Sequence, residues 1–174
     1  QRMEALIEQE IEHQQNNGNG RLIFKMNSLV DQRMIRKLYQ ASQAGVQIDL
    51  IVRGMCCLRP GLPKVSENIR VISVVGRFLE HSRVYYFHNG GQEHIYLGSA
   101  DLMPRNINWR VEVLFPVQDI RLVRYLRENV LETYLKANLK VRLMQPNGSY
   151  VILSPKTEER PLNPQEWLIA HHQK

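Results

Sequence analysis

The stretch RLIFKMNSLVDQRMIRKLYQASQAGVQIDLIVRG, residues 21–54, decides the fold. It begins as a short apolar strand and continues with Asp31, a residue type that caps helices at their start. The helix predicted after it has an apolar stripe at Met34, Ile35, Leu38 and Tyr39. Gly45 lies just past that stripe, and the mostly apolar run VQIDLIVRG then predicts a central strand. Strand, helix and strand in this order indicate a βαβ unit with a right-handed parallel crossover, and therefore an α/β fold.

The second strand of this unit ends at Arg53. Side chains at the carboxyl ends of parallel strands are where α/β sheets hold their ligands, so Arg53 marks a candidate ligand-binding edge. We expect a twisted sheet to gather further polar groups at the same end. The expected set is Lys25, Arg53, His81, Arg83, Ser99, Asp101, Arg110 and Glu112.

The run FLEHSRVYYF, residues 78–87, predicts another strand because it is rich in aromatic and β-branched residues. His81 and Arg83 lie in its middle, two positions apart, and alternate residues of a strand share a face. An imidazole and a guanidinium should therefore project side by side from a rigid element. Guanidinium groups match phosphate oxygens, and histidine can give or take a proton near neutral pH. The pair thus indicates phosphoryl chemistry.

The rest of the chain continues the mixture of helices and strands. We expect helices at 2–14 and 119–137, strands at 68–76, 93–101 and 109–117, a turn at 89–91, a hairpin at 140–154 and a tail helix from Pro164. In the strand at 109–117, Arg110 and Glu112 should share a face. The prediction is one mixed sheet flanked by helices, followed by an extension, residues 140–174, in which the sequence indicates no chemistry.

Composition narrows the class of protein. The chain has 174 residues, of which 43% are hydrophobic, which suits one domain with its own core. A net charge of +6 favours an anionic partner such as a phosphate-rich ligand, although it also serves solubility alone. The only cysteines, Cys56 and Cys57, are adjacent and poorly placed for a disulfide, which indicates a reducing compartment. No apolar run is long enough to cross a membrane.

Each candidate residue also has a purely structural interpretation. His81 could hydrogen-bond to Glu80 or Asp101, Arg83 could be an edge-strand charge in water, and Arg53 could pair with Asp49 or Glu112. Taken singly, these interpretations are the simpler ones, and it is the convergence of several basic groups that favours function. His81, His88 and His94 together suggest zinc, but no fourth ligand has suitable spacing, so the sequence predicts no metal site.

Several stretches resemble one known family. FKMNSLVD, GVQIDLIVRGMCCLRPG, VSENIRVISVVGRFLEHSRVYYF and YLGSADLMPRNINWRVEVLFPV are similar to the carboxyl-terminal domain of bacterial polyphosphate kinase, the larger, histidine-phosphorylating type. The resemblance runs from about residue 3 to 137 and implies a phospholipase-D-like fold for residues 1–139. Half-sites of that fold carry H-x-K-x4-D and G-S-x-N. Here HSR stands at 81–83, His88 replaces the acid, and GSAD stands at 98–101.

The resemblance implies reversible transfer of the terminal phosphate of ATP to a polyphosphate chain. The family does this through a phosphohistidine in a preceding domain, which we expect to lie outside this chain. His81 matches the second active-site histidine, a general acid or stabiliser, Arg53 matches an ATP-phosphate-contacting arginine, and Arg110 matches a further arginine needed for activity. We expect Arg83 and Lys25 to add to phosphate binding. The resemblance implies ATP and Mg²⁺ as cofactors, with the Mg²⁺ ligands outside this fragment.

The expected partners are polyphosphate, ATP, the remaining domains of the same chain and further copies of the full-length protein, without specific nucleic acid. The expected location is the cytoplasm, with peripheral membrane association allowed at the inner face. A single half-site lacks the nucleophile, so the fragment alone should bind phosphates weakly and not turn over. Two alternatives stay open: a phospholipase-D-like phosphodiesterase half that dimerises to pair two copies of His81, and a non-catalytic module that binds polyanions.

Overall fold

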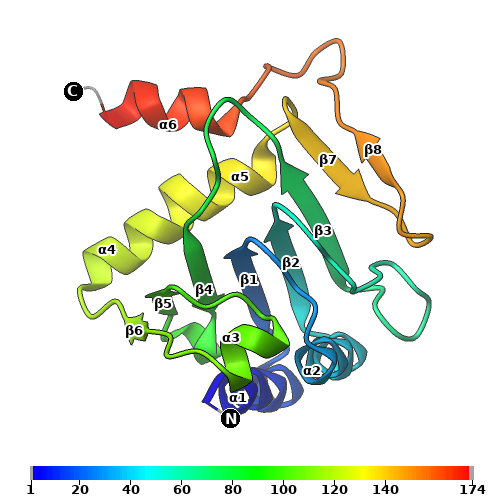
Figure 1. The fold of residues 1–174 in the computed structure, drawn as a ribbon, viewed down its shortest axis with the longest axis vertical. Coiled ribbons are helices and arrows are strands. Elements are labelled where there is room, and N and C mark those ends of the chain that lie inside the picture. The colour runs from blue at the N-terminus through cyan, green and yellow to red at the C-terminus, as the bar shows by residue number, and fades with distance from the viewer. Residues whose placement is uncertain (1, 173–174) are drawn as a thin grey trace.

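The computed structural model describes residues 2–172, and Figure 1 shows how their elements are arranged. Within that span the strands form one mixed sheet in the order β6-β5-β4-β1-β2-β3-β7-β8. The strands are β1 (Arg21–Met26), β2 (Gln47–Val52), β3 (Ile69–Val74), β4 (Arg83–Phe87), β5 (His94–Gly98), β6 (Leu114–Pro116), β7 (Val141–Met144) and β8 (Tyr150–Ile152). The helices are α1 (Arg2–Asn17), α2 (Gln32–Gln43), α3 (Pro104–Asn108), α4 (Ile120–Tyr125), α5 (Glu132–Lys136) and α6 (Pro164–His172), with a 3₁₀ turn η1 (Asn89–Gly91) and a π-helical turn η2 (Leu126–Leu131).

The βαβ unit predicted from residues 21–54 is confirmed. β1 and β2 pair in parallel and occupy the middle of the sheet. α2 connects them, and the Asp31 carboxylate caps its start by accepting a hydrogen bond from the Met34 backbone N–H at 3.0 Å. Gly45 follows the helix with a φ of 98°, a left-handed conformation that glycine adopts without a steric penalty.

Alternation along the strands divides the apolar side chains between two cores, one on each face of the sheet. Leu22 and Phe24 of β1 belong to the core with α1 and α2, whereas Ile23 belongs to the core with α4 and α5. Figure 1 shows α1 and α2 together on one side of the sheet and the α4–α5 segment on the other. Lys25 shares the parity of Ile23, so its side chain lies over Tyr134 of α5.

The helix predicted at 119–137 is present, with one irregularity. α4, η2 and α5 follow one another without a break, and the middle turn is π-helical. The Asp119 carboxylate caps the start by accepting from the Arg121 backbone N–H at 2.8 Å. Leu131 lies in the wider π-helical turn and Tyr134 lies after it, and both side chains are buried against the sheet.

The strand predicted at 78–87 is wrong in its first half. β4 begins only at Arg83, because its neighbours end there: Val84 pairs with Lys25 of β1, and Arg83 pairs with Gly98 at the end of β5. Residues 75–82 therefore form a connection outside the sheet, which we call the His81 loop. His81 and Arg83 consequently do not share a strand face.

The strand predicted at 109–117 is also mostly wrong. Only β6, Leu114–Pro116, pairs with β5, and residues 109–113 have no partner strand. The pattern W-R-V-E-V has a high strand propensity, but this segment leaves the sheet edge, and Val111 is fully exposed. The expected common strand face of Arg110 and Glu112 therefore does not exist.

The hairpin and helix expected within residues 140–174 are present. β7 and β8 are antiparallel, and β7 extends the main sheet by pairing with β3. Pro164 is the first helical residue of α6, and the Asn163 side chain accepts from the Gln165 backbone N–H at 3.1 Å. The extension thus lies against the main sheet.

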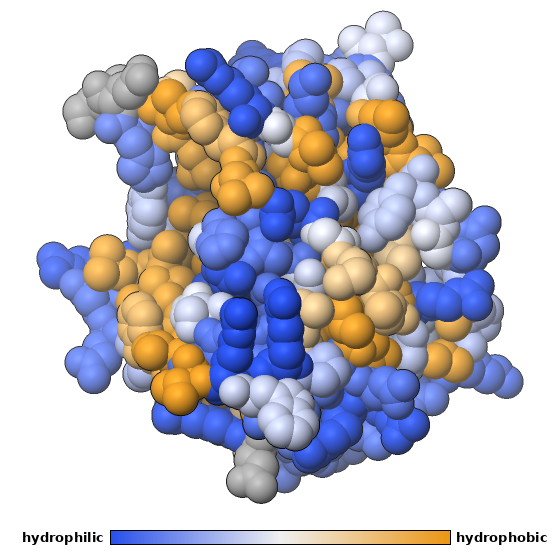
Figure 2. All heavy atoms as spheres, in the orientation of Figure 1, coloured by the Kyte–Doolittle hydropathy of each residue, from blue (hydrophilic) through white to orange (hydrophobic). Residues whose placement is uncertain are grey.

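The surface that Figure 2 displays mixes hydrophilic areas with apolar patches. One group of exposed apolar side chains follows the chain from α3 through β6 to α4: Ile107, Trp109, Val111, Val113, Phe115, Ile120 and Leu122. Within residues 2–172, none of the helices has both the length and the apolar character needed to span a bilayer.

Candidate active site

His81 lies on the exposed loop just before β4, where Arg83 orients it. The Arg83 Nη1–H group donates to the His81 ring Nδ1 at 2.9 Å and to the His81 carbonyl oxygen at 2.8 Å. A guanidinium has donors and no acceptor, so the imidazole Nδ1 must be the acceptor. The neutral ring therefore carries its proton on Nε2, and that N–H is free to donate outward.

Arg83 is itself fixed by Asp101. Its Nε donates to Asp101 Oδ1 and its Nη2 to Asp101 Oδ2, both at 3.2 Å, and the two side chains are 11% and 6% exposed. Asp101 also accepts from the Asn27 backbone N–H at 2.8 Å. The result is a hydrogen-bonded chain that runs from the buried Asp101–Arg83 ion pair to the exposed His81. The arginine in H-x-R and the aspartate in GSAD, both departures from the motif, are thus the two members of one ion pair.

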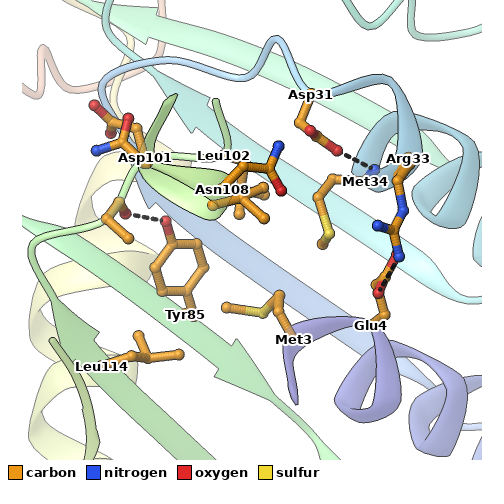
Figure 3. A pocket seen from close by; sticks show the side chains of 13 residues that line it. Met3, Glu4, Asp31, Arg33, Met34, Tyr85, Asp101, Leu102, Asn108 and Leu114 are labelled. Atoms are coloured by element: carbon orange, nitrogen blue, oxygen red, sulfur yellow. Dashed lines mark hydrogen bonds and ion pairs between the residues drawn. The ribbon is translucent and has the colours of Figure 1, made fainter. Parts of the chain in front are cut away.

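Tyr85 and a small apolar cavity flank the segment that delivers Asp101. The Tyr85 hydroxyl donates to the Ala100 carbonyl oxygen at 2.7 Å, and Figure 3 shows this contact beside Asp101. The cavity, of about 110 Å³, is lined by α1, α2 and α3 residues such as Met3 and Met34. The described residues that line it include Arg33 but neither His81 nor Arg53, so it is separate from those two candidate site residues.

Lys25 lies inside the protein rather than at the ligand-facing edge. Its side chain is 3% exposed, its Nζ is 2.9 Å from Glu80 Oε2, and it donates to Ser82 Oγ at 2.8 Å. The ammonium also lies over the Tyr134 ring, 5.0 Å from the centroid. Lys25 therefore holds the residues on both sides of His81, and its charge is already balanced by Glu80.

Glu80 is the centre of the contacts beneath the loop. It accepts from the Tyr134 hydroxyl at 2.9 Å and from Gln165 Nε2 at 2.7 Å, in addition to its ion pair with Lys25. Burial alone raises the pKa of Glu80, but the charge and hydrogen bond of Lys25, together with the other donors, outweigh it and leave the pKa lowered.

Arg53, at the end of β2, faces an open hollow. Its Nε donates to Asn27 Oδ1 at 3.2 Å, and it lines a hollow of about 450 Å³ together with Val74 and residues 75–80. The alternative pairing with Asp49 is not observed, because Asp49 instead lies 3.6 Å from Arg21 Nη2. Arg53 also lies close to Lys25 and Glu80, and therefore beside the His81 loop.

Arg110 lies in the exposed turn after α3. Glu112, two residues further on, has a carboxylate held by Ser99 Oγ and by Asn106 Nδ2, the latter at 2.5 Å. The hydrogen bonds from Ser99 and Asn106, helped by the charge of Arg110, lower the pKa of Glu112. Arg110 thus presents its guanidinium to solvent.

The other reactive groups have structural explanations. Burial raises the pKa of the Cys56 thiol to about 11, which disfavours a thiolate nucleophile, and both cysteines are free. His88 Nδ1 lies 3.2 Å from the Tyr86 hydroxyl. Among residues 2–172 no group of three or more His, Cys, Asp or Glu side chains could hold a metal ion.

Acidification is expected to destabilise the fold through Asp101 and Glu80. Burial raises the pKa of Asp101, but hydrogen bonds from Arg83 and the Asn27 backbone leave it below its ordinary 3.8, and that of Glu80 lies below 4.5. A lowered folded pKa stabilises the fold above the unfolded pKa, and this stabilisation disappears as the pH falls through the folded pKa. The urea concentration at the unfolding midpoint should therefore decrease as the pH is lowered from about 5 to about 3.

The matched variant for this experiment is Asp101→Asn, which removes one of the two groups. Its urea midpoint should be lower at neutral pH and should change less on acidification. If the urea midpoint changed equally with pH in the unchanged chain and in Asp101→Asn, Asp101 would not be a source of the acid sensitivity.

Comparison with known proteins identifies the family of this chain. The family model described as "Polyphosphate kinase C-terminal domain 2" matches residues 1–165. The chain belongs to this polyphosphate kinase family. A polyphosphate kinase from Synechocystis is 58% identical over 160 residues, covering 92% of this chain and 22% of the relative, and one from Bacillus cereus is 55% identical over 155 residues, covering 88% and 22%. The chain therefore spans about a fifth of the length of these polyphosphate kinases.

Solved structures support the family and the fold. A crystal structure of polyphosphate kinase from Porphyromonas gingivalis matches with a TM-score of 0.91 and 41% identity, covering 97% of this chain and 26% of that one. Nuc from Salmonella typhimurium, a phospholipase D family member, matches with a TM-score of 0.55 and 11% identity, covering 78% and 88%. The second likeness shows the fold alone, and it confirms the predicted phospholipase-D-like sheet.

Proposed function

We propose that this domain of the polyphosphate kinase family forms one half of an active site that transfers the terminal phosphate of ATP reversibly to polyphosphate. The other half, with the histidine that becomes phosphorylated, belongs to a preceding domain of the longer protein. In this proposal His81 is the group that stabilises the phosphoryl group during transfer. The observation that carries the proposal is the hydrogen bond from Arg83 to His81 Nδ1.

The tautomer set by Arg83 decides what His81 can do. With Nδ1 occupied as an acceptor, the outward Nε2–H can donate to a phosphate oxygen where negative charge develops. Protonation of Nδ1 would place a second N–H against the Arg83 guanidinium. Hydrogen-bond donation therefore fits the geometry better than full proton transfer, and of the two roles that the family resemblance allows, we assign His81 that of stabiliser.

The same tautomer disfavours a phosphodiesterase role. A nucleophilic histidine attacks phosphorus through an unprotonated ring nitrogen. In His81 the unprotonated nitrogen, Nδ1, is engaged by Arg83, and the exposed nitrogen carries the proton. Two copies of this half-site brought together would thus present two donors and no nucleophile.

We assign phosphate binding to Arg53 and Arg110 and supporting roles to Arg83 and Lys25. Arg53 borders the open hollow beside the His81 loop, and Arg110 is exposed to solvent. The charges of Arg83 and Lys25 are balanced by buried carboxylates, so they hold His81 in place instead. The guanidinium groups of Arg53 and Arg110, which form no ion pair with a described carboxylate, can neutralise the anionic ATP and polyphosphate ends that must approach each other.

The described residues do not fit a magnesium site of their own. The carboxylates nearest His81, Glu80 and Asp101, are engaged by Lys25 and Arg83. We propose that Mg²⁺ is bound elsewhere in the longer protein and supplies charge neutralisation to the ATP phosphates. Homo-oligomeric assembly, a cytoplasmic location and peripheral membrane contact stay proposals.

The 174-residue chain alone provides a direct test. It should bind ATP and polyphosphate weakly in calorimetry and should form no polyphosphate from ATP and Mg²⁺. Arg53→Ala should weaken binding by about 10- to 100-fold, as loss of a charge-assisted hydrogen bond predicts. Arg36→Ala, an exposed arginine on α2, is the matched control and should change little.

Two results would contradict the proposal. Polyphosphate synthesis by the isolated chain would show that no second half-site is needed. Hydrolysis of bis-p-nitrophenyl phosphate that depends on His81 would show a phosphodiesterase.

A further inference from the structure

The His81 loop is held from the tail of the chain. The Gln165 side chain accepts from the Phe78 backbone N–H at 2.9 Å, donates to the Phe78 carbonyl oxygen at 2.9 Å, and donates to Glu80 Oε1 at 2.7 Å. Gln165 is 7% exposed and lies 84 residues beyond His81 along the chain. The Gln165 amide thus makes the two backbone hydrogen bonds with Phe78 that a neighbouring strand would make, at a place where the sheet has ended.

Local sequence explains how Gln165 reaches the loop. Pro164 starts α6, and the cap from Asn163 fixes the Gln165 backbone N–H. Gly76 leaves the necessary room, because a Cβ there would lie 2.3 Å from Gln165 Oε1 and 2.6 Å from its Cδ. Figure 1 shows the connection from β3 to β4 passing beside α6.

Apolar packing does not hold the tip of this loop. Phe78 is 51% exposed and Leu79 is 70% exposed. The described contacts that fix the loop are polar: Gln165 and Tyr134 reach Phe78 or Glu80, and Lys25 reaches Glu80 and Ser82. A loop held by few directional contacts shifts when one of them is lost.

We propose that Gln165 is a positioning residue for phosphoryl transfer, and that the extension 140–174 is part of the machinery that places His81. The inference rests on the proposed role of His81. Gln165 acts through the backbone of Phe78 and through Glu80, and it does not touch the reacting phosphates. The extension, in which the sequence alone indicates no chemistry, thereby supports the active site.

The test uses the full-length kinase that carries this chain. Gln165→Met keeps the volume and removes all three hydrogen bonds, and it should lower kcat by about 10- to 100-fold because a catalytic group displaced by about 1 Å loses that much. The KM for ATP should stay within about twofold, since Arg53 and Arg110 are untouched. Gln43→Met is the matched control, because the Gln43 amide also donates to a loop carbonyl, that of Lys64, on another part of the surface.

Gly76→Ala tests the same contact from the opposite side. Its Cβ would displace the Gln165 amide, so it should reproduce the kcat loss without changing any donor or acceptor. The double variant with Gln165→Ala should be no worse than Gln165→Ala alone, because the collision and the hydrogen bonds vanish together. Additive losses would overturn the inference.

Hydrogen exchange separates this inference from the proposed function. In the full-length enzyme, the backbone amides of a peptide covering 75–82 should exchange faster in Gln165→Met and Gly76→Ala. Their exchange rate should be unchanged in Gln43→Met. If exchange accelerates but kcat does not change, Gln165 is structural and the inference fails. If His81→Ala keeps full turnover, the proposed function fails, whatever the exchange shows. If Gln165→Met changes neither exchange nor kcat, the contact does not position the loop.

Discussion

His81→Ala in the full-length kinase is expected to lower kcat by about 10²- to 10³-fold, the loss typical of removing one donor to a developing oxyanion. The expectation follows from the Arg83 contact, which leaves the Nε2–H of His81 as the outward donor. Steady-state polyphosphate synthesis from ATP measures it. His94→Ala is the matched control, because His94 is an exposed histidine on β5 and should leave kcat unchanged.

Two amide substitutions distinguish hydrogen-bond donation from proton transfer. Glutamine places an N–H near the position of the histidine Nε2, whereas asparagine places it near Nδ1. His81→Gln should therefore retain several times more activity than His81→Asn, which should behave like His81→Ala. Equal inactivity of His81→Gln and His81→Ala would contradict the donor role and favour proton transfer.

Breaking the Lys25–Glu80 ion pair is expected to cost about 3–5 kcal/mol of unfolding free energy. The side chains are 3% and 11% exposed, so Glu80→Leu leaves the Lys25 ammonium buried without its partner. The double variant Lys25→Met with Glu80→Leu removes both charges and should lose much less than either single variant. Urea unfolding of the 174-residue chain measures all three.

The control for this cycle is an exposed pair. Lys136 Nζ lies 3.9 Å from Glu132 Oε2 and its side chain is 70% exposed, so Lys136→Met should cost only about 0.3–0.5 kcal/mol. Equal losses at Lys25 and Lys136 would show that the buried pair does not contribute through its burial. If the double variant lost as much unfolding free energy as the two single variants together, the ion-pair explanation would be wrong.

The candidate site could be predicted from the sequence only in part. The position of Arg53 was predictable because it ends the second strand of a βαβ unit, and the carboxyl ends of parallel strands form the ligand-binding edge of such a sheet. The roles of Tyr134 and Gln165 were missed, and Glu80 was considered only as a hydrogen-bond partner of His81. Nothing in the sequence connects the loop to Gln165, because hydrogen-bond partners that far apart have no periodic signal.

Strand ends were the other weak point. FLEHSRVYYF and WRVEVLFPV both have residues that favour strands, and in each only the second part enters the sheet. A strand continues only while a neighbour supplies hydrogen bonds, and β1 and β5 stop at Met26 and Gly98. Strand propensity can be estimated from the segment's own residues. The point at which the strand ends depends on the length of the strand that pairs with it, and the segment's own residues do not give that length.

The amino-acid order by itself determined the βαβ unit, the capping of α2 by Asp31 and the identity of the polar groups, since these depend on neighbours within a few residues. Only the tertiary structure decided that Arg83 pairs with Asp101 and turns His81, that Lys25 points inward to Glu80, and that Gln165 holds the loop. The physical reason is that hydrogen bonds and ion pairs act over about 3 Å, and only packing of the sheet brings such distant residues that close.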